Sequence, residues 1–175
     1  MESPLLSQIQ KLRRQKMLNE KRVMIVSLGC DKNLVDTEKM LGILADEGCT
    51  FTDDEAQAQV IIVNTCCFIG DAKEESIQNI LDLARFKTEG KLEALIATGC
   101  LSQRYQDEML EELPELDGIL GISAWHTIAD VVRDALEGKR PRNLMSTGVL
   151  KQSYNKETAD NRRSLCLFKD CRRMQ

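Results

Sequence analysis

The sequence predicts an α/β fold with an open, mostly parallel sheet flanked by helices. Short β-branched apolar runs alternate with longer amphipathic segments between residues 23 and 136. This alternation is typical of strand–helix–strand units, whose strands lie parallel with helices on both faces of the sheet. Three of the runs, VMIVSLGC, VIIVNTC and ALIATGC, also end alike, in small or polar residues and then a cysteine. The three cysteines are separated by 36 and 34 residues, about the length of one such unit.

The strands are predicted from their β-branched and apolar content. Runs that are apolar almost throughout are typical of strands buried on both faces. The predicted strands are 23–28, 60–64, 92–98 and 119–122, with a short one near 49–51.

The helices are predicted from apolar residues at helical spacing and from their end signals. The first covers 36–47 and stops at Gly48, and the second begins near Asp71, which with Glu74 has the spacing of a capping box. The third covers 102–113 before Pro114, and the last is capped by Ser123 and ends at Gly138. Each of the four longer predicted strands is thus followed by a predicted helix.

The chain divides into three predicted parts. Residues 1–21 form a leader that is helical or disordered, 22–140 form the folded domain, and 141–175 form a linker and flexible tail. No apolar run reaches the roughly 18 residues needed to span a bilayer, and the N-terminus does not read as a secretory signal. We therefore expect no membrane association and a cytoplasmic location.

Charge is unevenly distributed along the chain. Residues 23–138 carry 8 basic and 23 acidic side chains, a net −15, whereas 1–22 carry +4 and 139–175 carry +7. An acidic surface repels polyanions, so the middle segment argues against nucleic-acid binding by this domain and suits a basic protein partner. The simpler interpretation is that these carboxylates solvate helix faces.

Cys30, Cys66 and Cys100 each follow a predicted strand directly. The carboxyl ends of parallel strands meet at one edge of a sheet, where ligands bind in folds of this kind. The following helices point their positive ends at the same edge and would stabilise an anionic group there. Three thiolates suit an iron–sulfur cluster with one open iron, or zinc completed by His126 or water.

Packing is the alternative for all of these cysteines, because free cysteine is common in protein cores. We assign Cys49 and Cys67 to packing, Cys166 and Cys171 to an incidental place in the tail, and His126 to a surface or packing position. Neither a GxGxxG nor a GxxxxGK[ST] loop is present in the sequence, which argues against a nucleotide binder.

Three motifs in order, SLGCDKNLVDTEKMLG, VNTCCFIGDAKEESIQNIL and ATGCLSQRY, resemble the N-terminal domain of the methylthiotransferases. The wording GCDKNLVDTE is closest to the branch that modifies an aspartate of a small-subunit ribosomal protein, whereas tRNA-modifying relatives typically have GCQMN there. The resemblance covers about residues 22–148 and implies a flavodoxin- or Rossmann-like sheet.

The resemblance also implies a site and a reaction. In this family, cysteines matching Cys30, Cys66 and Cys100 hold an auxiliary 4Fe–4S cluster with one open iron, which is thought to carry the transferred sulfur. A second 4Fe–4S cluster, in a barrel domain, binds S-adenosylmethionine and generates the radical. The substrate is a basic ribosomal protein. We expect five polar residues of the motifs to support the auxiliary cluster, each with a cap or turn role as its alternative: Asn33, Asp36, Glu38, Asn64 and Gln103.

The chain departs from the family plan after the third motif. The cysteine signature of the radical domain is absent, and Cys166 and Cys171 do not reproduce it. We therefore expect a truncated, frameshifted or excised N-terminal portion that is inactive alone. No general acid or base can be nominated in it. The alternatives are a non-catalytic interaction domain that binds an iron–sulfur cluster or zinc, and the tRNA-modifying relative.

Overall fold

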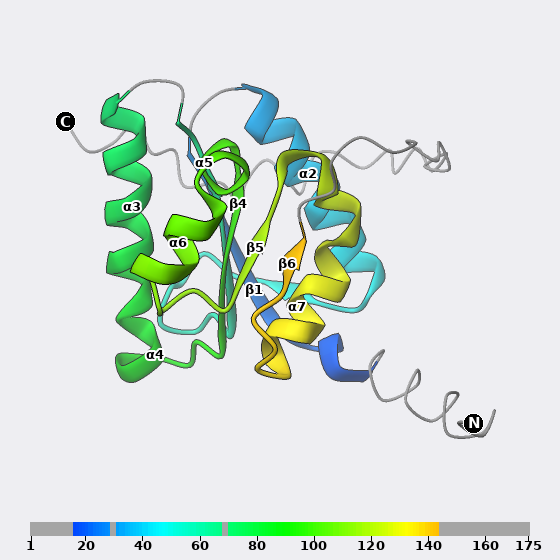
Figure 1. Ribbon diagram of the computed structural model, residues 1–175. Coiled ribbons are helices and arrows are strands. Elements are labelled where there is room, and N and C mark those ends of the chain that lie inside the picture. Colours follow the sequence, from blue (N-terminus) through cyan, green and yellow to red (C-terminus); the bar gives the residue numbers. More distant parts are fainter. Residues whose placement is uncertain (1–15, 29–30, 68–69, 144–175) are drawn as a thin grey trace, which may run out of the picture.

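A six-stranded, wholly parallel sheet forms the centre of the protein (Figure 1). The computed structural model describes residues 16–28, 31–67 and 70–143. The strand order is β2-β1-β3-β4-β5-β6, and every neighbouring pair is parallel. The strands are β1 (Arg22–Ser27), β2 (Thr50–Phe51), β3 (Val60–Thr65), β4 (Ala94–Gly99), β5 (Gly118–Leu120) and β6 (Arg142–Asn143). The predicted α/β fold with an open parallel sheet is confirmed.

Helices cover both faces of this sheet, as predicted. They are α2 (Asp31–Asp46), α3 (Gly70–Ala84), α4 (Phe86–Glu89), α5 (Cys100–Arg104), α6 (Gln106–Glu112) and α7 (Ile128–Leu136), with a 3₁₀ segment η1 (Ile122–Thr127). Helices α2 and α7 lie on one side of the sheet and α3, α5 and α6 on the other (Figure 1).

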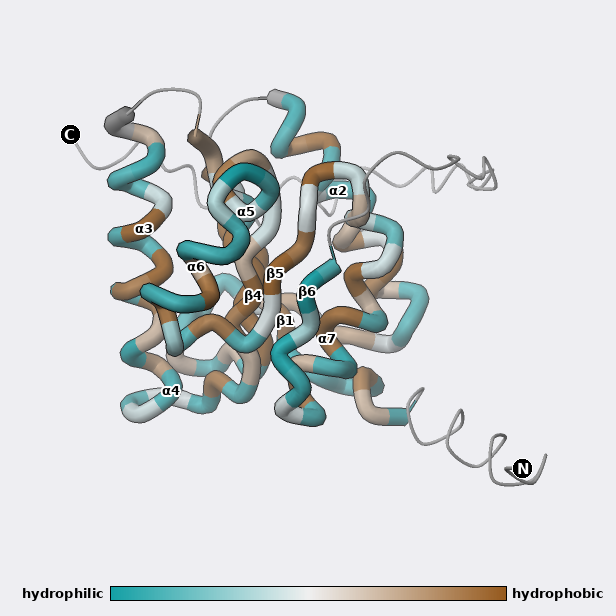
Figure 2. The backbone as a smooth tube through the Cα atoms, viewed as in Figure 1, coloured by the Kyte–Doolittle hydropathy of each residue, from teal (hydrophilic) through white to brown (hydrophobic). Residues whose placement is uncertain are grey.

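Two apolar cores result from the alternation of side chains along the strands. In β3, Ile62 faces the core that contains Met40 and Leu44 of α2 and the apolar residues of α7. Its neighbour Ile61 faces the second core, which contains residues of α3, α5 and α6. Successive strand residues point to opposite faces, so a strand between two helical layers must be apolar throughout. Figure 2 shows the strands as the most hydrophobic part of the molecule, between helices with hydrophilic outer sides.

Three helical segments differ from the sequence prediction. Helix α2 begins at Asp31 rather than residue 36, so Asn33 and Asp36 lie inside it. The predicted helix 102–113 starts earlier, at Cys100, and is split into α5 and α6 at Tyr105, whose φ of −119° and ψ of 32° leave the helical region. Ser123 lies within η1 rather than at a helix N-cap, and α7 starts only at Ile128.

The chain ends lie mostly outside the described residues. Of the predicted leader, Leu18 is fully buried in the core shared with α2 and α7, so the described end of this segment packs on the domain. A strand that the sequence did not predict, β6, pairs with β5 at Arg142–Asn143. The tail, including Cys166 and Cys171, lies outside the described residues.

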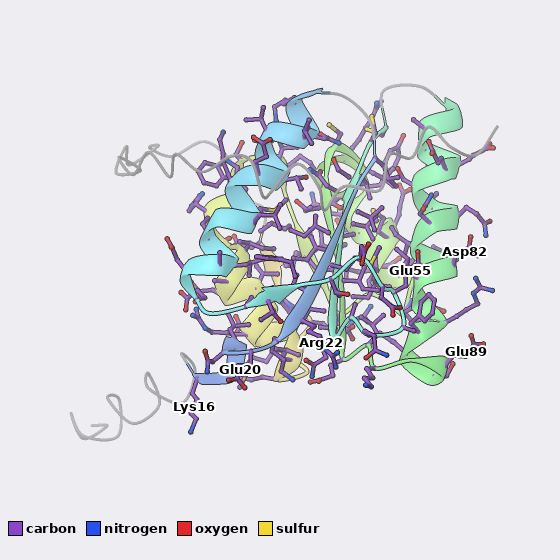
Figure 3. The ribbon with its side chains drawn as sticks, turned by 180° about the vertical axis from the view of Figure 1, so that it is seen from behind. Lys16, Glu20, Arg22, Glu55, Asp82 and Glu89 are labelled. Carbon is purple, nitrogen blue, oxygen red and sulfur yellow. The ribbon has the colours of Figure 1, made fainter. Side chains whose placement is uncertain are left out.

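The outer surface carries many of the acidic side chains. Asp82 on α3 and Glu89 on α4 project outward from that helical layer (Figure 3). Among the described residues, the helices are too short or too polar to traverse a lipid bilayer.

Candidate functional site

Two of the three cysteines singled out by the sequence lie at the ends of neighbouring strands. Thr65 of β3 is paired with Gly99 of β4, and Cys66 and Cys100 are the next residues in each strand direction. Neighbouring strands are about 4.8 Å apart, so the two cysteines occupy adjacent positions on the carboxyl edge of the sheet. Cys66 is buried and Cys100 is half-buried.

The third cysteine, Cys30, lies outside the described residues, as do residue 29 before it and residues 68–69 after Cys67. The strand before it is described: Ser27 of β1 pairs with Asn64 of β3, and the Leu28 amide donates to the Asn64 carbonyl at 2.9 Å. The chain therefore reaches this edge two residues before Cys30. Within the part of the chain that the structure describes, no three histidine, cysteine or acidic side chains are grouped so that they could hold a metal ion.

Gly99 brings the ends of β3 and β4 into close contact. Its φ is +98° and its ψ is −158°, a region that only glycine adopts readily. A Cβ atom at this position would lie 2.4 Å from the Thr65 carbonyl oxygen and 2.6 Å from Asn64 Oδ1. The glycine before Cys100 is thus required both by its backbone conformation and by the space around it.

A buried side-chain amide joins the ends of β1 and β3. Asn33, in the first turn of α2, is 2 % exposed. Its Nδ2 donates to the Leu28 carbonyl at 2.8 Å and to the Thr65 carbonyl at 3.1 Å. These carbonyls precede Cys30 by two residues and Cys66 by one. Asn33 therefore fixes the spacing of the two strand ends that lead to these cysteines.

The contacts continue across the edge to β4. Asn64 Nδ2 donates to the Asn33 carbonyl at 2.8 Å and to Thr37 Oγ1 at 2.9 Å. Thr65 Oγ1 donates to the Thr98 carbonyl at 2.6 Å, two residues before Cys100. We call these residues the buried polar network; its members are Asn33, Thr37, Asn64, Thr65 and Thr98, all at most 3 % exposed. Through it, three strand ends are held at fixed spacing.

Helix α3 is tied to the same edge through Ser76. The Cys66 amide donates to Ser76 Oγ at 3.2 Å, and this oxygen also lies 3.1 Å from the Cys66 carbonyl and 2.8 Å from the Ala72 carbonyl. The backbone of Cys66 is therefore anchored by α3, and its thiol is not needed for that contact.

The other polar residues predicted to support the site lie outside this network. Asp36 is half-buried on α2 and pairs with Lys32 at 2.7 Å and with Lys39 at 3.6 Å. Glu38 and Gln103 are both half-buried, on α2 and α5. Of the five candidates, the structure places Asn33 and Asn64 in the network between the strand ends.

The remaining described cysteines pack in the interior. Cys49 is 8 % exposed in the core beside α2, its Sγ lies 3.5 Å from the Leu18 carbonyl, and burial raises the pKa of its thiol to about 11. Cys67 packs against the core beside α3. His126 is exposed in η1, with its ring edge-on to Trp125. These positions agree with packing and surface roles.

Sequence reasoning missed the hydroxyl groups of the site. Thr65 and Thr98 read as ordinary β-branched strand residues, and Ser76 as a polar residue of a helix. The available signal was a threonine before each of two strand-terminal cysteines, in VNTC and ATGC.

Comparison with known proteins shows which family the chain belongs to. Residues 22–121 match the family described as uncharacterized protein family UPF0004. This match covers β1 to β5 and both described strand-terminal cysteines. The chain belongs to this family.

Several similar proteins have the name ribosomal protein uS12 methylthiotransferase RimO. That from Lachnoclostridium phytofermentans is 48 % identical over 131 residues, covering 75 % of this chain and 30 % of the relative. Those from Desulforamulus reducens and Desulforudis audaxviator are 46 % and 50 % identical, covering 85 % and 74 % of this chain and 37 % and 28 % of the relatives. The chain thus spans about a third of the length of these relatives, and its resemblance to the ribosomal-protein branch is confirmed.

Proposed function

We propose that this family member is the cluster-binding domain of a methylthiotransferase that modifies an aspartate of a small-subunit ribosomal protein. Cys30, Cys66 and Cys100 would hold an auxiliary 4Fe–4S cluster with one open iron. The register that pairs Thr65 with Gly99 supports the proposal, because Cys66 and Cys100 are the next residues along these two neighbouring strands. We expect the protein to act in the cytoplasm, on a basic substrate that suits its acidic surface.

The residues at the edge fit such a group. Thiolates are the usual ligands of iron–sulfur clusters, and backbone groups that are already satisfied leave the sulfur atoms available for coordination. Ser102, in the first turn after Cys100, has a fully buried hydroxyl with no hydrogen-bond partner among the described residues. An unsatisfied buried hydroxyl costs about 1–3 kcal/mol, and a group bound near Cys100 is one partner that would satisfy it.

The cluster, when bound, would supply the sulfur that is transferred. The residues of this chain hold and orient it. Asn33 fixes the strand ends before Cys30 and Cys66, Thr65 fixes those before Cys66 and Cys100, and Ser76 anchors the Cys66 backbone. A ligand set held in this way loses little conformational freedom when iron enters.

We assign the radical chemistry to the part of the relatives that the match does not cover. The second 4Fe–4S cluster and S-adenosylmethionine would be bound there. This chain supplied with S-adenosylmethionine is therefore expected to form no methylthio product without those parts.

Anaerobic reconstitution tests the ligand assignment. The wild-type chain is expected to bind about four irons, and Cys→Ala variants at 30, 66 and 100 should each lose most of this iron and its visible absorbance. Cys67→Ala is the matched control, because Cys67 adjoins Cys66 but packs in the core; it should keep its iron. A colourless protein that binds one zinc, or equal iron in all four variants, would refute the cluster assignment.

A further inference from the structure

Two cationic side chains lie on one aromatic ring near the thiol edge. Lys73 Nζ is 4.1 Å from the centre of the Tyr105 ring, and Arg104 Cζ is 5.6 Å from it. Lys73 belongs to the start of α3, one helical turn before Ser76, which binds the Cys66 backbone. Tyr105 follows α5, which starts at Cys100. The ring therefore bridges the two helices that leave Cys66 and Cys100.

The Tyr105 ring is held in place by packing against the core. Tyr105 is half-buried and packs against the core beside α3. Stacking of a cation on an aromatic face is favourable even at an exposed site, so both side chains are held at this position. Stacking occupies the π face of the ring and leaves the N–H groups of both cations available. Lys has three such donors and Arg has five.

Neither Lys73 nor Arg104 forms an ion pair in the described part of the chain. This is unexpected between residues 23 and 138, where acidic residues outnumber basic ones 23 to 8. Lys32, on the first turn of α2, illustrates the usual situation, since it pairs with Asp36 at 2.7 Å. Two cations that share one aromatic ring, without a carboxylate in the described part of an acidic domain, are suited to binding an anion from outside.

We propose that Lys73 and Arg104 bind the carboxylate of the substrate side chain and hold it beside the thiol edge. This inference rests on the proposed function, from which the acidic substrate residue comes; the binding residues are the new element. A guanidinium and an ammonium together match the planar charge of a carboxylate.

The surroundings of this pair select the context of that carboxylate. Glu74 and Glu75 adjoin Lys73, and Asp107 and Glu108 follow Tyr105, all of them exposed. A segment that is acidic throughout is repelled by these four side chains. A single carboxylate flanked by basic residues finds its own charge and those of its neighbours complemented. The site therefore fits one acidic residue within a basic protein segment.

Two short basic peptides, identical except for a central aspartate or asparagine, test this site. Their dissociation constants for the full chain are measured by fluorescence anisotropy at low salt. The aspartate peptide is expected to bind about fivefold more tightly, a factor typical of an exposed charged contact. Lys73→Gln and Arg104→Gln should each remove most of this preference.

Lys32→Gln is the matched control, because it removes a cation that lies on the first turn of α2, on the other side of the sheet, and is already neutralised by Asp36. It should retain the preference. Lys73→Arg and Arg104→Lys keep the charge and should retain it too, which separates loss of charge from loss of folding. Equal affinity of the wild type for both peptides, or a preference that survives Lys73→Gln and Arg104→Gln together, would overturn the inference.

The same preparations separate this inference from the proposed function. Their iron content after reconstitution reports on the cysteines alone. A chain that discriminates the peptides but binds no iron would refute the cluster and retain the carboxylate site. A chain that binds iron but does not discriminate would refute the carboxylate site alone.

Discussion

Replacement of Gly99 by alanine adds one methyl group and is expected to separate the ends of β3 and β4, where Cys66 and Cys100 follow. The backbone of Gly99, at φ +98° and ψ −158°, costs a residue with a Cβ about 1–3 kcal/mol. The new Cβ would also lie 2.4 Å from the Thr65 carbonyl oxygen, against the 3.0 Å that such atoms tolerate. The ends of β3 and β4 must therefore separate by about 0.6 Å, which weakens at least one strand hydrogen bond, by about 1 kcal/mol.

Together these costs predict a loss of about 2–4 kcal/mol in the free energy of unfolding. Domains of this size have about 5–15 kcal/mol in total, so Gly99→Ala should be clearly measurable by urea unfolding. Gly138→Ala is the matched control: Gly138 also has a positive φ, of +74°, but a Cβ there would meet nothing within 4 Å. It should lose only the backbone contribution, about 1 kcal/mol.

The difference between the two alanine variants therefore measures the contact between the strand ends. Iron binding by the Gly99→Ala protein should fall with it, because Cys100 follows the displaced residue directly. Equal destabilisation by Gly99→Ala and Gly138→Ala would show that β3 and β4 do not approach each other closely here, and would refute the reasoning.

Two further predictions concern buried polar groups. Asn33→Ala leaves the Leu28 and Thr65 carbonyls without their side-chain donor and should lower the free energy of unfolding in urea by about 2–4 kcal/mol. The control is Asn79→Ala, which removes a similar bond from the outer side of α3 and should cost under about 0.5 kcal/mol. Similar losses in the two variants would contradict the role of the buried polar network. Burial raises the pKa of Cys49 from 9.0 to about 11, so its neutral thiol favours the folded state fully below pH 9. This contribution should be lost as the pH rises from 9 to 11, by about 1.4 kcal/mol at pH 10. The difference in unfolding free energy between the wild type and Cys49→Ala should decline in the same way. A difference that does not change with pH would contradict the raised pKa of Cys49.

Much of the sheet could be predicted from the sequence because its strands are buried on both faces. Val60 to Val63 are apolar without a break, and only a strand between two helical layers needs that pattern. The start of α2 could not be placed, since its first turn is polar and its buried residue there is Asn33. The break between α5 and α6 at Tyr105 could not be predicted either, because no glycine or proline marks it in the sequence.

The candidate site was predictable in its cysteines but not in its supports. Cysteines after strands carry a positional signal, because every such residue reaches the same edge of a parallel sheet. Thr65 and Ser76 carry no such signal, since threonine is common in strands and serine in exposed helix turns. Their roles depend on which carbonyl lies opposite, and that is decided by the register between distant segments.

The sheet ends in very short strands on both sides. Among the described residues, which end at 143, β2 and β6 have two residues each, whereas β1, β3 and β4 have six each. A lateral strand this brief exposes few unpaired amides and carbonyls, and Arg142 places a positive charge on one of them. Another polypeptide that docked there could gain only a couple of ladder hydrogen bonds. The short edge strands thus disfavour strand pairing between two copies of the chain. A sheet with such apolar central strands is otherwise prone to this pairing while it folds.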